Sequence, residues 1–191
     1  MLKKLCLFAA LIVSIYFVLM YLNINPTHRV GDKLDEFNGV PIYYNGAINH
    51  TEDRNTTNDG YNLGLRFQCV EFVKRYYYER FSHKMPNSMG NAKDFFLPSV
   101  PNGALNLERN LTQYVNGAGE KPQVNDIVVF APWLFNRYGH VAIVSRVGDD
   151  FIEVVQQNPG PFNDTRELFP LTRNNDGWQV VNRRVIGWLR K

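Results

Sequence analysis

The sequence predicts an α+β domain with an antiparallel sheet, preceded by one apolar helix. Three observations support this: an uncharged apolar run near the amino terminus, a strongly periodic helix in the middle of the chain, and β-rich runs in its second half. Helices first and strands afterwards are typical of α+β domains. The roughly 165 residues that follow the apolar run suit a single domain with its own core.

The apolar run extends from Leu5 to Leu22 and contains no charged residue, while Lys3 and Lys4 precede it. As a helix it would be about 27 Å long, close to the hydrocarbon thickness of a bilayer. The segment after it, Tyr21 to Pro26, has no small-x-small cleavage pattern. We therefore favour an uncleaved signal anchor over a cleaved signal peptide. Lysines ahead of a first helix usually stay in the cytoplasm, which would place the remaining chain outside it, in a periplasmic or extracellular location.

This pattern divides the chain into a transmembrane segment (1–24), a polar linker (25–36) and a folded domain (37–191). The domain is expected to open with an extended segment or strand over 37–44. The stretch from His50 to Tyr61 is rich in Asn, Thr and Asp, so we expect an exposed loop there.

A helix is predicted from Gln68 to Phe81, because its apolar residues recur at helical spacing. They fall at i, i+3, i+4, i+7 and i+8 of one stripe: Cys69, Phe72, Val73, Tyr76 and Tyr77. Cys69 therefore begins the helix and faces the core. Glu71 and Arg75 lie off the stripe at i and i+4, and the default interpretation is a surface ion pair.

The rest of the chain favours strands. A short helix near 91–96 is followed by a loop-rich segment from Leu97 to Lys121. The predicted strands then cover 126–130, 140–147, 151–157, 179–184 and 185–189. Gly148 to Asp150 is a hairpin signal between two of them.

The charge pattern excludes some classes of partner. Without Lys3 and Lys4, 19 Lys and Arg side chains remain against 18 Asp and Glu, a net charge of +1. This near-neutral balance, with no dense cluster of Lys and Arg, gives no sign of a basic surface that would bind nucleic acid. His, Cys and carboxylate residues show no metal-ligand spacing, so no metal site is expected.

Cys69 is the one cysteine outside the amino-terminal apolar segment, which holds Cys6. An unpaired cysteine is either a small buried hydrophobe or a reactive thiol. At a helix start the helix dipole stabilises a thiolate and is expected to lower the thiol pKa. Such a thiolate needs a proton shuttle, and His140 is the best candidate, since it opens an apolar strand directly after Gly139.

Three patterns, taken together and in order, carry a family resemblance: Phe67-Gln68-Cys69-Val70-Glu71-Phe72, then Asn125-Asp126-Ile127-Val128-Val129-Phe130 leading to Gly139-His140-Val141-Ala142, and finally Gln156-Gln157-Asn158. The chain resembles the CHAP family, the cysteine, histidine-dependent amidohydrolases and peptidases, whose fold is papain-like. It is similar in particular to the amidase module of glutathionylspermidine synthetase/amidase enzymes. The likeness covers about residues 37 to 191.

The resemblance implies roles for individual residues. Cys69 would be the nucleophile and His140 its base. The side-chain amide of Gln68 and the backbone N–H of Cys69 would form the oxyanion hole. The implied reaction is acyl transfer through a thioester, which water resolves without a cofactor.

The third catalytic position departs from the family, which commonly has Glu or Asp there, because this chain has Gln156. The carbonyl oxygen of an amide can still orient an imidazole, although it lacks the full charge that stabilises an imidazolium. Asn158 or Glu153 are alternative orienting residues. Trp133, Phe135 and Tyr138 precede His140 and are expected either to shape a substrate cleft or to be core.

Three functional hypotheses follow. The first is a membrane-anchored cysteine amidase or endopeptidase that cleaves cell-wall peptide (peptidoglycan) outside the cytoplasm. The second is hydrolysis of a glutathionylspermidine-like amide, which the membrane segment opposes because that substrate is cytosolic. The third is a catalytically reduced module that binds peptides, which Gln156 suggests and the presence of both Cys69 and His140 opposes.

Overall fold

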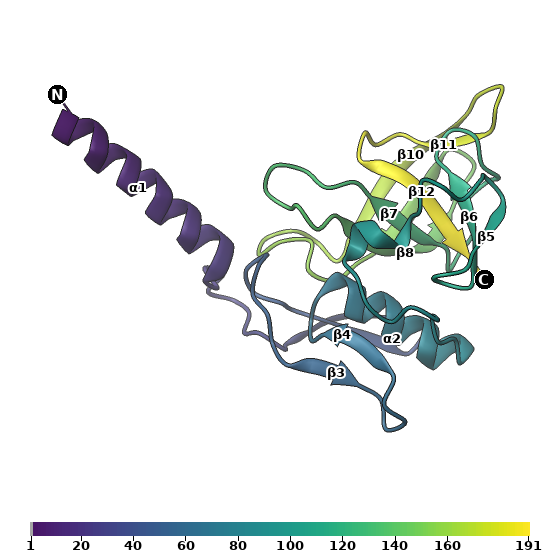
Figure 1. Ribbon diagram of the computed structural model, residues 1–191, viewed down its shortest axis with the longest axis horizontal. Coiled ribbons are helices and arrows are strands. Elements are labelled where there is room, and N and C mark those ends of the chain that lie inside the picture. Colours follow the sequence, from purple (N-terminus) through teal and green to yellow (C-terminus); the bar gives the residue numbers. More distant parts are fainter. Residues whose placement is uncertain (1) are drawn as a thin grey trace.

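The computed structural model describes residues 2–191 and contains two α-helices, one 3-10 helix and twelve strands (Figure 1). Helix α1 (Leu2–Tyr21) is the expected apolar helix, and it projects away from the rest of the chain in Figure 1. Its segment Lys3–Tyr21 is long and apolar enough to cross a bilayer, and its side chains are almost all exposed. Those exposed apolar side chains are consistent with a helix that needs a bilayer or another surface to cover it.

The domain is built on an eight-stranded sheet in which every pair of neighbours is antiparallel, in the order β11-β10-β9-β8-β7-β12-β6-β5. The strands are β5 (Ala104–Asn106), β6 (Leu111–Val115), β7 (Ile127–Phe130), β8 (His140–Val147), β9 (Phe151–Val155), β10 (Arg166–Arg173), β11 (Trp178–Val180) and β12 (Val185–Arg190). The predicted α+β class with an antiparallel sheet is confirmed.

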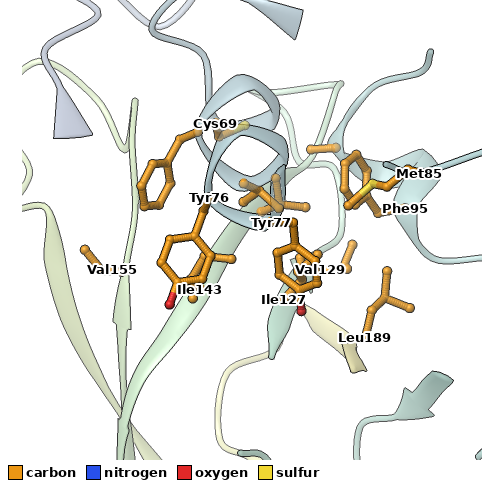
Figure 2. Packing of buried hydrophobic residues seen from close by; sticks show 14 of the residues in the cluster. Cys69, Tyr76, Tyr77, Met85, Phe95, Ile127, Val129, Ile143, Val155 and Leu189 are labelled. Carbon is orange, nitrogen blue, oxygen red and sulfur yellow. The ribbon is translucent and has the colours of Figure 1, made fainter. Parts of the chain in front are cut away.

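Helix α2 (Cys69–Phe81) packs on one face of this sheet, as the apolar stripe predicts. Its buried side chains contact alternate residues of the central strands, shown in Figure 2 as Tyr76 and Tyr77 against Ile127, Val129 and Ile143. Burying each such side chain contributes roughly 1.5–3 kcal/mol. The intervening residues of β7 and β8 point to the opposite face and join a second cluster around Trp188. Cys69 belongs to the first cluster, so this packing fixes it over the sheet.

Two hairpins lie outside the large sheet. The first pairs β1 (Lys33–Phe37) with β2 (Val40–Tyr43), and the second pairs β3 (Arg54–Thr56) with β4 (Asn62–Leu65). Figure 1 shows α2 between the sheet and the second hairpin. A 3-10 helix, η1 (Ala92–Phe95), stands where the short second helix was predicted.

The structure differs from the expected organisation at both hairpins. Strand β1 lies mostly within the segment 25–36, which was expected to be a linker, because Asn38 and Gly39 turn the chain with positive φ. The Asp35 carboxylate also accepts hydrogen bonds from Arg166. The stretch from His50 to Tyr61 was expected to be a loop, yet it contains β3.

Three strands of the large sheet were not predicted: β5, β6 and β10. In each of the first two, one buried position is polar, which hides the alternation. Asn106 and Gln113 are fully buried, and they satisfy one another through a bond of 3.0 Å from Asn106 Nδ2 to Gln113 Oε1. Strand β10 begins with charged residues and contains Pro170, a residue that argues against an interior strand.

Candidate active site

The chain enters α2 through a sharp turn that presents Cys69 at the first helical position. Phe67 has φ = +65°, a left-handed conformation, and Gln68 is extended as the N-cap. The Phe67 ring packs edge-on against Tyr43, with ring centroids 5.5 Å apart, which holds the turn in place. Cys69 consequently sits at the top of α2, as Figure 2 shows.

The thiol of Cys69 is buried, with 7% of the residue exposed. Burial raises its pKa to about 11, while hydrogen bonds from the backbone N–H groups of Val141, Val70 and Cys69 act in the opposite direction. The expected lowering of the pKa of Cys69 by the helix start is therefore wrong, because removal of the thiol from water outweighs the effect of the N–H groups. The bond from Val141 places the sulfur beside the residue that follows His140.

His140 is the first residue of β8, where it pairs with Phe130 of β7. The preceding Gly139 has φ = +76°, and a Cβ there would lie 2.7 Å from the Phe130 carbonyl oxygen. Only glycine fits this turn, which places His140 at the start of β8. The pKa of His140 is lowered to about 4, mainly by burial; a hydrogen bond to Gln156 acts in the opposite direction, and the nearby positive charge of Arg184 contributes to the lowering. At neutral pH the resting imidazole is neutral.

Gln156 lies beside His140, with 2.9 Å between Gln156 Oε1 and His140 Nε2. The amide nitrogen of Gln156 donates to Glu167 Oε2 at 3.2 Å and to the Asp164 carbonyl at 3.4 Å. The oxygen of Gln156 therefore faces the imidazole, so His140 Nε2 carries a proton and Nδ1 is left as the acceptor.

Gln68 and Asn158 hydrogen-bond to each other rather than to His140. Asn158 Nδ2 donates to Gln68 Oε1 at 2.9 Å, and Gln68 Nε2 donates to the His50 carbonyl at 2.5 Å. Asn158 thus orients Gln68, the expected oxyanion residue, rather than His140. Glu153 bonds to Ser145 and Arg166, and it forms no hydrogen bond to His140.

Glu71 and Arg75 form a buried ion pair, so their interpretation as a surface pair is wrong. Arg75 Nε lies 2.7 Å from Glu71 Oε1, and the two side chains are 8% and 3% exposed. Gln157, which is fully buried, donates to Glu71 Oε2 at 2.9 Å and to the Gln68 carbonyl at 3.0 Å. Its oxygen accepts from the Tyr43 N–H at 2.8 Å. The sequence reasoning missed Gln157, although strand alternation puts two successive residues on opposite faces.

Cys69, His140, Gln68 and Asn158 all line one pocket of about 520 Å³. Tyr21 at the end of α1 and Tyr138 also line it, whereas Trp133 and Phe135 do not. Among the described residues that line the pocket, Arg54 is the one with a permanent charge. Across residues 2–191, no group of three or more His, Cys, Asp or Glu side chains is arranged to hold a metal ion.

The family model of the CHAP domain matches residues 56–158, a segment that contains Cys69, His140, Gln156 and Asn158. The chain belongs to the CHAP family. All three motifs named above lie inside the matched segment, and the resemblance to the CHAP family is confirmed.

Curated relatives of this CHAP chain fall into two groups. It is 28% identical over 119 residues to trypanothione synthetase and 30% identical over 116 residues to glutathionylspermidine synthase, both of Crithidia fasciculata. It is also 30% identical over 111 residues to endolysin PlyTW of Staphylococcus phage Twort. These matches cover 62%, 58% and 58% of this chain but 18%, 16% and 20% of the relatives. The chain therefore matches about a fifth or less of the length of these relatives.

Among solved structures, this chain is similar to Ly7917, whose crystal structure was determined with the hydrolyzing product of MDP. The two chains align with a TM-score of 0.41 and 18% sequence identity. The match covers 65% of this chain and 54% of that one.

Proposed function

We propose that this protein is a cysteine amidase or endopeptidase that hydrolyses amide bonds in cell-wall peptide. The observation that carries the proposal is that Cys69 and His140 line one pocket, with Gln156 bonded to Nε2 of the imidazole. Such a nucleophile, base and orienting group is the arrangement that acyl transfer through a covalent intermediate requires. Membership of the CHAP family supports the same chemistry.

The proposed reaction begins from a neutral thiol and a neutral imidazole. As Cys69 Sγ attacks the amide carbonyl carbon, its proton passes to His140 Nδ1. The oxyanion that develops is stabilised by the backbone N–H of Cys69 and by Gln68 Nε2, which has a second hydrogen besides the one bonded to the His50 carbonyl. The imidazolium then protonates the leaving amine, the C–N bond breaks, and a thioester forms. Water attacks the thioester with His140 again as base, releasing the acid and the thiol.

Three features favour wall peptide as the substrate. One relative is a phage endolysin. Helix α1 is a candidate membrane span, and as an uncleaved signal anchor it would hold the domain outside the cytoplasm, where wall peptide lies. Arg54 supplies a positive charge to the pocket, and stem peptides of the wall carry free carboxylates. We assign residues 1–24 to the anchor and 37–191 to the catalytic domain, with part of the segment 25–36 packed on the domain.

The second candidate substrate is a glutathionylspermidine-like amide, which the likeness to the two Crithidia enzymes favours. Mass spectrometry separates the candidates: purified peptidoglycan and glutathionylspermidine are each incubated with the wild-type protein and with Cys69→Ala. We expect new peptide termini from peptidoglycan with the wild type and none with Cys69→Ala. Cys6→Ser is the matched control, since it removes the other cysteine and should keep full activity.

Cleavage of glutathionylspermidine alone would transfer the assignment to the second substrate. If the wild type changes neither substrate, both enzymatic assignments fail, and binding of peptide without hydrolysis would then indicate a binding module.

A further inference from the structure

Gln156 stands between an imidazole and a carboxylate. Its oxygen is 2.9 Å from His140 Nε2, and its nitrogen is 3.2 Å from Glu167 Oε2. Glu167 comes from β10, where it is in register with Val154 of β9. A backbone bond of 2.8 Å from the Gln156 N–H to the Thr165 carbonyl keeps the two strands together just beyond β9. The third catalytic position lacks a carboxylate, but Glu167 supplies one on the far side of Gln156, separated from the imidazole by that amide.

The chemistry of the two neighbours decides which way the amide points. A primary amide donates from its nitrogen and accepts at its oxygen, whereas an ionised carboxylate only accepts. Glu167 consequently selects the nitrogen of Gln156, as the Asp164 carbonyl also does. The oxygen must then face His140, where it can only accept a hydrogen bond from Nε2–H.

This orientation matters for the base. With a proton on Nε2, the lone pair of His140 lies on Nδ1, which can accept the proton of the thiol. An inverted amide would instead donate to Nε2 and favour a proton on Nδ1, and an imidazole in that tautomer cannot take a proton from Cys69.

Glu167 also supplies the charge that an amide lacks. The positive charge of Arg184 disfavours the imidazolium of His140. Burial lowers the pKa of the Arg184 guanidinium, and the nearby negative charge of Glu167 acts in the opposite direction. When His140 becomes positive during the reaction, the carboxylate offsets part of that repulsion. Because Glu167 is exposed to solvent, this effect is moderate.

We propose that Glu167 is a positioning residue: its carboxylate fixes the orientation of the Gln156 amide and, through it, the tautomer and charge of His140. The pair of Gln156 and Glu167 thereby replaces the single carboxylate of the third catalytic position. The inference rests on the proposed function, because it assigns a role in that reaction.

The test compares the full-length wild type with Glu167→Gln, using kcat/KM as a function of pH and the rate at which iodoacetamide alkylates Cys69. We expect Glu167→Gln to lower kcat/KM about tenfold and to move the acid limb of the profile to lower pH, because loss of a negative charge disfavours the imidazolium. Glu120→Gln, which removes another exposed glutamate, should leave both unchanged.

A compensating pair sharpens the test. Gln156→Glu alone places two carboxylates side by side and should be impaired, whereas Gln156→Glu combined with Glu167→Gln restores one carboxylate and one amide in exchanged positions. We expect the double variant to recover activity to at least the wild-type value. The inference is overturned if Glu167→Gln matches the wild type in activity, pH profile and alkylation rate, or if the double variant, folded with a wild-type Tm, is no more active than Glu167→Gln.

The two proposals fail in different ways. Absence of hydrolysis by the wild type contradicts the proposed function. An unchanged alkylation rate and pH profile in Glu167→Gln, beside a wild type whose Cys69 reacts through His140, contradicts the role of Glu167.

Discussion

The two halves of the proposed active site are held in place by different kinds of interaction, although each uses a glutamine bonded to a glutamate. On the thiol half, Gln157 bonds to Glu71, which is buried and neutralised by Arg75. On the imidazole half, the adjacent Gln156 bonds to Glu167, which is exposed. Because successive residues at a strand end face opposite ways, one dipeptide serves both halves.

The difference indicates what each pair contributes. Gln157 ties α2 to the β1–β2 hairpin through the Gln68 carbonyl and the Tyr43 N–H, so it belongs to the packing that places Cys69. Gln156 contacts His140 and two acceptors near the surface. Damage to the thiol half should therefore reduce stability, and damage to the imidazole half should reduce the rate.

The largest stability effect is expected on the thiol half. Glu71→Gln leaves the guanidinium of Arg75 buried without its carboxylate, which should lower the free energy of unfolding by about 3–5 kcal/mol in urea titrations. Glu79→Gln, an exposed glutamate of the same helix, should change it by no more than about 0.5 kcal/mol. Equal unfolding midpoints for Glu71→Gln and the wild type would remove the distinction between the halves.

The imidazole half should nonetheless make stability depend on pH. The pKa of His140 is lowered to about 4 from 6.5, so the unfolded chain binds a proton there before the folded protein does. Stability should fall as the pH drops from about 6.5 to about 4, by about 3 kcal/mol in total. Urea unfolding at a series of pH values measures this slope, which should be smaller in His140→Ala. Parallel pH curves for the two proteins would show that His140 is not the group responsible.

A matched pair of substitutions tests the comparison directly. Gln156→Ala should lower kcat about a hundredfold, because the imidazole loses its orienting group, with about 1 kcal/mol lost in stability. Gln157→Ala should lose about 2 kcal/mol in stability, because it leaves buried partners unsatisfied, and should retain more of the activity per folded molecule. Steady-state kinetics and urea unfolding of both variants give the two readouts. The opposite ranking would reverse the roles assigned to the two glutamines.

The smallest effect concerns Arg54, which adds a charge to the thiol side of the pocket. Arg54→Gln should raise KM about fivefold for a peptide substrate with free carboxylates, with little change in kcat, as expected for a partly exposed ion pair of about 1 kcal/mol. Arg66→Gln, an exposed arginine outside the pocket, is the control. If KM for a carboxyl-amidated peptide rises equally, Arg54 does not recognise carboxylates.

Strong periodicity made part of this structure predictable. The helix from Gln68 to Phe81 and the strand from His140 to Val147 were predicted nearly to the residue, since their buried faces are apolar. The placement of Gln156 at the imidazole followed from the family resemblance.

The features that were not predicted share a physical cause: they depend on tertiary packing around polar side chains, which a local sequence pattern does not report. The i, i+4 pair of Glu71 and Arg75 has the same pattern whether exposed or buried, and only the surrounding hairpins bury it. The raised pKa of Cys69 likewise depends on tertiary packing, which the helix start alone does not reveal. Glu167 lies on a strand that was not predicted, so its place behind Gln156 had no signal in the sequence.

The proposed function depends above all on activation of the Cys69 thiol by His140. The most direct test is the rate of Cys69 alkylation by iodoacetamide at pH 7, followed by peptide mapping in a Cys6→Ser background. We expect His140→Ala to slow this alkylation at least about a hundredfold, the lower end of the range for general-base catalysis by a positioned imidazole. A thiol that is inert in the wild type, or that reacts equally fast in His140→Ala, would contradict it.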